Sequence, residues 1–167
     1  MKFIYILFAF LTFQNCYSMQ FPVNLKNDTL PKGAYSYDLL KINFVNLDLT
    51  YMSLWDSGIQ FEQHFLTEED KAEKISKEWN LLLQSMADFF AKNNYIWKSP
   101  TSFSVKFYFD KNGGIDYLFY NPKNNEFNPN LQFVSLLNKF IKNYRFDLKA
   151  KSKYSQCGGV IFHPKGK

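Results

Sequence analysis

The chain has 167 residues, of which 46% are hydrophobic and 20% aromatic, and its formal net charge is +5 at pH 7. This length suits one domain, and a chain so rich in Phe and Tyr can bury a core, which argues against wholesale disorder. The positive charge is too small to indicate nucleic-acid binding. Its sign is uneven, because acids are dense between Asp56 and Glu78, whereas Asp147 is the only acid from Lys139 onward. This pattern predicts two solvated faces or, alternatively, a basic end that meets an acidic partner or a membrane surface.

Residues 1–18 have the pattern of a secretory signal peptide. Lys2 is followed by an uncharged apolar run from Phe3 to Phe13, and small residues at Cys16 and Ser18 suit cleavage after Ser18. The run is short for a transmembrane span, which needs roughly 20 apolar residues. An uncleaved anchor and lipidation at Cys16 are the alternatives. All three interpretations place the domain outside the cytoplasm, in the periplasm or cell envelope.

Residues 19–66 are predicted to form an extension that contributes one or two strands. Residues 19–32 contain two prolines and no helical period, which favours an extended lead-in. Apolar residues then alternate from Ile42 to Tyr51 with a slip of phase at Asn46, and this pattern predicts two short strands or one bulged strand. A helix fits this stretch less well, because the stretch is rich in residues that favour strand or turn.

Two amphipathic helices are predicted after this extension. Thr67 and the three acids that follow it suit the N-terminus of a helix from about Glu68 to Lys92. Its apolar residues recur at three- and four-residue steps: Ile75, Trp79, Leu82, Leu83, Met86, Phe89 and Phe90. Asn128-Pro129 is a favourable start for the second helix, because asparagine caps and proline fits the first turn. Its apolar stripe, which like the first is expected to be core, consists of Phe133, Leu136, Leu137, Phe140, Ile141 and Tyr144.

Residues 103–120 (FSVKFYFDKNGGIDYLFY) predict a β-hairpin between these helices. In the first strand, apolar residues alternate with Ser104, Lys106 and Tyr108, so that one face carries Val105, Phe107 and Phe109. Asn112-Gly113 accepts the positive φ angles that a tight hairpin turn demands. The apolar residues of the returning strand share one face only if a residue is inserted near the turn, and Gly114 could supply that bulge: these residues are Ile115, Leu118 and Tyr120.

Residues 154–162 (YSQCGGVIF) predict a last strand, and Gly158-Gly159 within it suggests a bulge or close packing. Residues 67–163 then form an α+β domain, a small antiparallel sheet with two helices packed on one face, and 164–167 form a tail. We expect the last strand at an edge of the sheet, where its N–H and C=O groups are open to strand addition. The other face is expected to leave an aromatic surface. The predicted partner-binding residues are Tyr154, Gln156, Gly158 and Val160 at the edge, and Tyr108 and Tyr117, beside Phe119, on the aromatic surface.

Three segments of this domain carry a family resemblance. They are residues 105–120 (VKFYFDKNGGIDYLFY), with an alternating strand, an Asp-x-x-Gly turn and spaced apolar residues, the helix end Tyr144-Arg145-Phe146, and the final strand Gly159-Val160-Ile161-Phe162. In these features residues 75–162 resemble the C-terminal domain of TonB-type energy transducers. The resemblance implies an αββαβ domain in the periplasm. It also implies docking on outer-membrane transporters, by pairing of the edge strand with their N-terminal segment.

No catalytic or metal-binding constellation is predicted. Asp56, Glu62 and His64 carry ligand types that suit zinc or manganese, but their spacing matches no known site, and ordinary surface residues are expected. Cys157 and His163 could act as nucleophile and base. Six residues of extended chain would separate them by about 20 Å, however, and Cys157 is expected to be a small buried hydrophobe.

If cleavage removes Cys16, Cys157 is alone and no internal disulfide holds the domain. The sequence therefore predicts an exported binding module without cofactor, metal or enzymatic activity, whose partner is a protein such as an outer-membrane or envelope protein. Nucleic acid is not expected, and a membrane only through the N-terminus if it is uncleaved or lipidated at Cys16. The alternatives are a structural or assembly subunit of an envelope complex and, less favoured, a small secreted enzyme.

Overall fold

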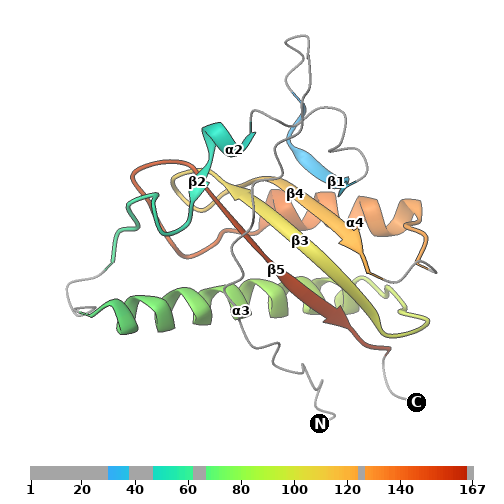
Figure 1. Cartoon of the computed structure of the whole chain (residues 1–167). Coiled ribbons are helices and arrows are strands. Elements are labelled where there is room, and N and C mark those ends of the chain that lie inside the picture. Colours follow the sequence, from blue (N-terminus) through green and yellow to red (C-terminus); the bar gives the residue numbers. More distant parts are fainter. Residues whose placement is uncertain (1–29, 38–46, 62–66, 124–126, 165–167) are drawn as a thin grey trace.

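The computed structural model describes residues 30–37, 47–61, 67–123 and 127–164 (Figure 1). In these residues the chain forms one five-stranded sheet in the order β1-β4-β3-β5-β2, with two long helices against one face. The predicted signal peptide, most of the lead-in and the stretch around Ile42 lie outside the described residues.

The three central strands are β3 (Thr101–Phe109), β4 (Ile115–Pro122) and β5 (Tyr154–Phe162), and β3 pairs antiparallel with both neighbours. The outer strands are β1 (Gly33–Ser36), parallel to β4, and β2 (Met52–Ser53), parallel to β5. The chain is thus a mixed α and β fold as predicted, but its sheet is mixed rather than antiparallel. The reason is that the predicted extension supplies both outer strands, and long connections rather than hairpins join them to their neighbours.

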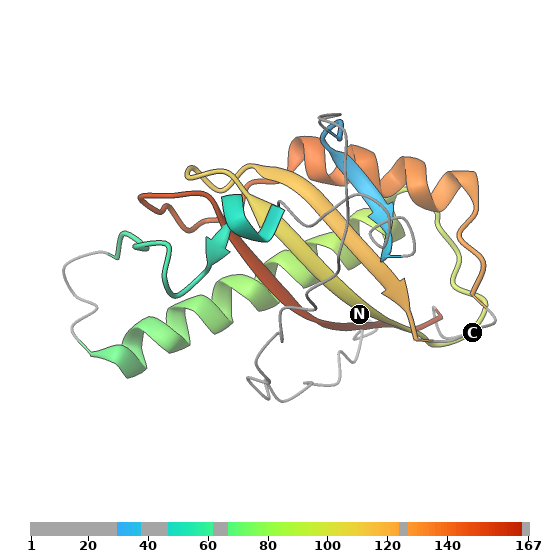
Figure 2. The ribbon, with the colours of Figure 1, turned by 45° about the horizontal axis from the view of Figure 1, so that its top comes forward.

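The helices α3 (Glu68–Lys92) and α4 (Leu131–Asn143) lie on the same side of the sheet (Figure 2). α3 begins as predicted, since Thr67 Oγ1 accepts a hydrogen bond from the N–H of Asp70 at 3.0 Å and the Asp70 carboxylate accepts one from the N–H of Thr67 at 3.1 Å. α4 begins later than Asn128-Pro129 suggested. Its cap is Asn130, whose Oδ1 accepts from the N–H of Phe133 at 2.8 Å, so the proline precedes the helix.

The core between the sheet and the two helices is rich in aromatic side chains. Phe103, Phe107 and Phe109 of β3 point into it and are at most 1% exposed. Trp79 of α3 packs edge-on to Phe107, with ring centroids 5.5 Å apart. A Cβ atom on Gly158 of β5 would lie 2.9 Å from the Trp79 ring, so only glycine fits there. The close packing predicted for the glycine pair is therefore confirmed at Gly158. It lets β5 pack directly against the Trp79 ring of α3.

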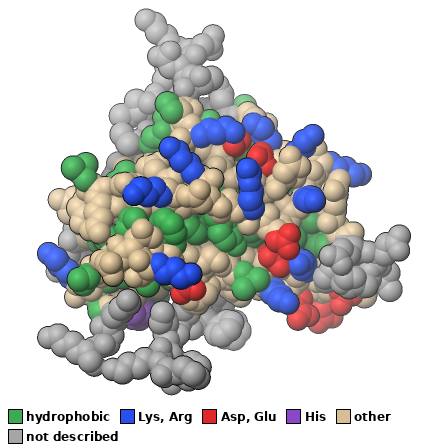
Figure 3. All heavy atoms as spheres, turned by 180° about the vertical axis from the view of Figure 1, so that it is seen from behind, with side chains coloured by type: hydrophobic (Ala, Val, Ile, Leu, Met, Phe, Trp, Pro, Cys, Tyr) green, Lys and Arg blue, Asp and Glu red, His purple; other side chains and the backbone are tan. Residues whose placement is uncertain are grey.

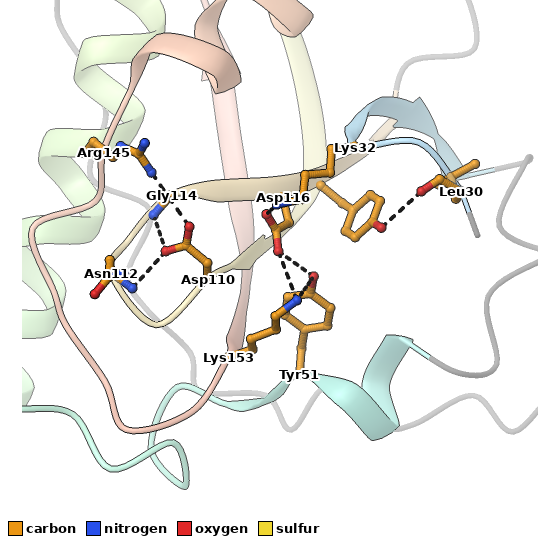
Figure 4. Close-up of polar contacts among 10 residues, drawn as sticks. Leu30, Lys32, Tyr51, Asp110, Asn112, Gly114, Asp116, Arg145 and Lys153 are labelled. Atoms are coloured by element: carbon orange, nitrogen blue, oxygen red, sulfur yellow. Dashed lines mark hydrogen bonds and ion pairs between the residues drawn. The ribbon is translucent and has the colours of Figure 1, made fainter.

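The hairpin turn is longer than the tight turn that Asn112-Gly113 suggested. The N–H of Asp110 donates to the C=O of Gly114 at 2.8 Å, which closes a three-residue loop. Within this loop the left-handed conformation falls on Gly113, at φ 81°. The Asp110 carboxylate accepts from the N–H groups of Asn112 and Gly114 at 2.8 and 2.9 Å (Figure 4). This side chain closes the turn in place of a two-residue connection.

One extra residue lies in β4 directly after the turn. Tyr108 pairs with Tyr117 and Phe109 pairs with Ile115, which leaves Asp116 as the inserted residue of a bulge. The insertion predicted from the apolar spacing is thus confirmed, but Asp116 supplies it rather than Gly114. The bulge turns the Asp116 side chain to the face of the sheet that points away from the helices.

That second face is covered by the chain's own N-terminal segment. Tyr108 and Phe119 lie on it as predicted, but they are only 2% and 0% exposed. Tyr51 packs on Tyr108, with ring centroids 5.1 Å apart. The partly buried residues that complete this cluster are Leu30, Tyr35, Tyr37, Leu47 and Tyr117. The expectation of an open aromatic surface is therefore wrong for Tyr108 and Phe119.

Part of this cover is the short helix α2 (Leu47–Thr50), where a strand was predicted. The N–H of Tyr51 donates to the C=O of Leu47 at 2.8 Å. Residues four apart on a helix lie on the same face, so this turn lets both side chains reach the aromatic cluster while Leu49 is 82% exposed. Burial of this pair against the sheet outweighs the local preference for strand.

Candidate functional site

The strand β2 covers only the beginning of β5. Met52 pairs with Tyr154 and Ser53 with Ser155, and the N–H of Leu54 donates to the C=O of Ser155 at 3.1 Å. The chain then turns away, as the N–H of Asp56 donates to the C=O of Ser53 at 3.1 Å. Beyond Ser155, the described residues contain no strand beside β5 on the side away from β3. The second half of β5 is therefore an edge among the described residues, but β2 lies outside its start, so the prediction that this strand lies at an edge holds only beyond Ser155.

The direction of each backbone group follows from these hydrogen bonds. The C=O groups of Lys153 and Ser155 point toward β2, since they accept from Met52 and Leu54 at 3.1 Å each. Backbone groups alternate in direction along a strand. The N–H and C=O groups of Gly159 and Ile161 therefore point away from β3, outward from the open edge. Gly159 is exposed and Ile161 is 40% exposed.

The four residues predicted to pair at the edge have the opposite phase. Tyr154, Gln156, Gly158 and Val160 are the partners of alternate β3 residues, and their backbone groups face β3. The Tyr154 side chain is also 0% exposed, and its OH donates to the C=O of Leu148 at 2.6 Å. The four positions predicted for edge pairing thus face β3, and the residues that alternate with them face outward. All nine residues of β5 suit a strand, so nothing local marks which of them face outward.

A buried carboxylate on the second face is a feature that the sequence analysis missed. Asp116 is 2% exposed. One of its oxygens accepts from the Tyr51 OH at 2.7 Å and lies 3.5 Å from Lys153 Nζ, and the other forms an ion pair with Lys32 (Figure 4). The signal was an acid within the apolar run IDYLFY, where a charged residue needs partners if it is buried.

The surroundings of Asp116 decide its chemistry. Burial acts to raise the pKa of the carboxyl, but hydrogen bonds from Lys32 and Tyr51 and the nearby Lys153 together hold that pKa below its ordinary value. Burial and the bond to Asp116 raise the pKa of the Tyr51 hydroxyl, which keeps its proton. A charged carboxylate with saturated partners acts as an anchor rather than as an acid or base. It ties the lead into β1, the segment before β2 and the start of β5 to the bulge of β4.

A second acid holds α2 on the same face. Asp48 accepts from Lys106 Nζ at 2.6 Å and from the Tyr108 OH at 2.9 Å. Burial, and then the proximity of Asp48, raise the pKa of the Tyr108 hydroxyl. Tyr108 was predicted to contact a partner, but its hydroxyl bonds to Asp48 and thereby holds α2 against the sheet. Tyr117 also serves this segment, because its OH donates to the C=O of Leu30 at 3.1 Å.

Of the residues weighed for chemistry, Asp56, Cys157 and His163 lie within the described ranges. Cys157 is half-buried rather than buried, and it is disulfide-bonded, so the structure offers no free thiol there. The expectation that no internal disulfide holds the domain was made for a chain that has lost Cys16, and it does not describe the full-length chain. His163 is exposed at the end of β5. Within the described ranges no three His, Cys, Asp or Glu side chains gather to hold a metal ion. Glu62 and His64 lie outside those ranges, and so do residues 1–18 with Cys16. The signal peptide and the fate of Cys16 therefore stay predictions.

The helix side of the molecule has a groove between α3 and α4, with a volume of about 220 Å³. Apolar side chains form a strip across this side, with Lys and Arg side chains along it (Figure 3). The groove is lined by Ser85, Asp88, Phe89, Lys92, Phe140, Asn143 and Tyr144. Its polar groups are the carboxylate of Asp88, the ammonium of Lys92, the amide of Asn143 and the hydroxyls of Ser85 and Tyr144.

The comparisons with known proteins add no relative. No family model, characterised protein or solved structure matches this chain. Among the described helices, none is both long and apolar enough to cross a membrane. The TonB-like resemblance and the binding role drawn from it therefore remain proposals.

Proposed function

We propose that this chain is an exported protein-binding module, TonB-like in its use of a strand edge, that recognises an extended segment of a partner along the second half of β5. The observation that carries the proposal is the pair Gly159 and Ile161. Their backbone groups point outward from an edge beside which the described residues place no strand after Ser155. Backbone pairing with an added strand supplies affinity at such an edge.

The rest of the fold supports this role by holding the edge still. Gly158 lies against Trp79, and Phe162 stacks on Trp97 with ring centroids 4.3 Å apart. Asp116 fastens the start of β5 through Lys153. An edge strand fixed at its start, middle and end needs little ordering when a partner binds, which lowers the entropic cost of association. Export is the expectation from the signal-peptide pattern of residues 1–18.

Two substitutions at one position test the proposal. Peptides are selected from a random displayed library on the full-length protein, and their affinities are measured by fluorescence anisotropy. Gly159→Pro removes the outward N–H, and proline is tolerated on an edge strand, so we expect binding to weaken at least roughly tenfold. Gly159→Ala keeps the N–H, and its Cβ has room, since the nearest atom is 3.8 Å away. The alanine variant is expected to bind as the wild type does, and equal binding by both variants would contradict the proposal.

A further inference from the structure

The two sides of α3 differ in chemistry. Four residues on the side toward α4 line the groove described above: Ser85, Asp88, Phe89 and Lys92. The period of 3.6 residues places another set on the opposite side: Ala72, Ser76, Leu83 and Ala87. This second set, here called the α3 strip, is uncharged and half-buried.

The C-terminal half of the α3 strip, Leu83 and Ala87, lies level with the open edge of β5, because Trp79 contacts Gly158 and Phe90 contacts Phe162. Trp79 places α3 beneath β3 and β5, because its ring contacts Phe107 and lies against Gly158. α4 lies instead beneath β4 and β1, the side to which its Asn138 reaches by accepting a hydrogen bond from Ala34. The side of α3 that points away from α4 is therefore the side nearest the free edge of the sheet.

The chain itself shows what this edge accepts. At the start of β5, β2 bonds to the C=O groups of Lys153 and Ser155. The residue that follows β2, Leu54, is 1% exposed and belongs to the core between sheet and helices. An apolar side chain beside β5 is thus buried while its backbone pairs with the strand. Farther along, Leu83, Ala87 and Val160 are each partly buried against the same core, and they offer an added strand the same kind of support.

We propose that the ligand of this edge is an extended segment of about six residues with apolar side chains at every second position. Those side chains would lie on the α3 strip, and the intervening ones would lie on the outer face beside Gly159. The length follows from the stretch of β5 beyond Gln156, which at 3.3 Å per residue spans about 20 Å. A charge at an inward position would lose its water against the uncharged strip, so the segment carries its charges, if any, at the alternate positions. This inference rests on the proposed function and adds the chemistry of the partner.

Matched peptides and matched variants test it on the full-length protein. One labelled eight-residue peptide has valine at every second position with threonine and glutamine between, and a second has the same composition with its valines contiguous. We expect the alternating peptide to bind at least roughly tenfold more tightly, because only it places all its valines on one face. Leu83→Lys should weaken that binding by a similar factor, whereas Leu81→Lys, on the solvent side of the same helix, should leave it unchanged. Thermal unfolding of both variants reports whether they are folded.

The outcomes separate this inference from the function on which it rests. Slower amide exchange at Gly159 and Ile161 of the wild type on binding the alternating peptide would support both, even if Leu83→Lys fails to fold. Binding weakened by Gly159→Pro but indifferent to peptide pattern would overturn the inference and keep the function. Binding indifferent to Gly159→Pro would overturn both. A dimer by sedimentation that Gly159→Pro dissociates would make a second copy the occupant and would also overturn the inference.

Discussion

The two edges of the sheet differ in how far their outer strands and nearby side chains cover the backbone groups. At one edge β1 is four residues long, and the N–H of Ala34 donates to Asn138 Oδ1 of α4 at 3.0 Å. At the other edge β2 is two residues long and leaves β5 after Ser155. A helix side chain therefore occupies a backbone donor at the first edge, whereas Gly159 and Ile161 face no strand among the described residues. Short strands and side chains thus block an edge, and a further strand can add at the stretch that they leave unblocked.

The largest loss of stability is expected from removing the α3 side chain on which β5 packs. Trp79→Ala removes the ring that lies under Gly158, and large-to-small substitutions of this kind cost about 3–5 kcal/mol of unfolding free energy. Urea denaturation measures the loss. Leu81→Ala on the same helix is the control, because its side chain is 47% exposed, and it should change the free energy of unfolding by less than about 0.5 kcal/mol. Equal losses in the two variants would show that α3 does not support β5.

A smaller loss is expected when the anchor at the start of β5 is changed. Asp116→Asn keeps the shape of the side chain but removes the charge that pairs with Lys32 and Lys153. Because a buried side chain then loses its ion pairs with two lysines, we expect a loss of about 2 kcal/mol. Asp147→Asn, an exposed position, should have little effect. An unchanged free energy of unfolding in Asp116→Asn would mean that the cost of burying the Asp116 charge equals the stabilisation that its partners provide.

The same anchor gives stability a defined dependence on pH. The pKa of Asp116 is lowered in the folded protein from its ordinary value of 3.8, so the unfolded chain binds this proton more readily. The stabilisation by Asp116 is therefore complete well above pH 3.8 and is lost as the pH falls through 3.8 toward the lower folded value. Denaturation at several pH values should show the gap between wild type and Asp116→Asn closing on acidification. A gap that widens below pH 4 would contradict this assignment.

The smallest effect is expected at the blocked edge. Asn138→Ala removes the acceptor of the Ala34 N–H and should cost about 1 kcal/mol, with faster exchange of the Ala34 amide. Asn143→Ala in the same helix is the control, because the Asn143 side chain only donates to the C=O of Lys139 on an exposed surface. Unchanged exchange at Ala34 would remove the contrast between the two edges.

Much of the fold could be predicted because its signals are local. The helical period around Trp79, the cap at Thr67 and the alternation in β3 each follow from spacing alone, and each is confirmed. The spacing of the apolar residues in β4 also required a bulge, but it did not show that Asp116 is the inserted residue. Local preference failed at Leu47–Thr50, where burial of Leu47 and Tyr51 against the sheet favours a helical turn.

The candidate site could be predicted only in part, because it depends on distant pairings. The strand order predicted the last strand at an edge, and this holds only beyond Ser155, because β2 lies outside its start. Which of its residues face outward depends on where β2 pairs, and that pairing joins residues about 100 positions apart. The Asp116 anchor likewise joins Lys32, Tyr51 and Lys153 from three segments. No local pattern reports such contacts, so the aromatic face was expected to be open when the chain covers it.

Amide hydrogen exchange along β5 of the full-length protein, measured by NMR without any ligand, decides whether the edge beyond Ser155 is open. We expect alternation, with slow exchange at Gly158 and Val160, whose N–H groups bond to β3, and fast exchange at Gly159 and Ile161, whose N–H groups point outward from the edge. Slow exchange at all four amides would show that this edge is already occupied and that no further strand can add there.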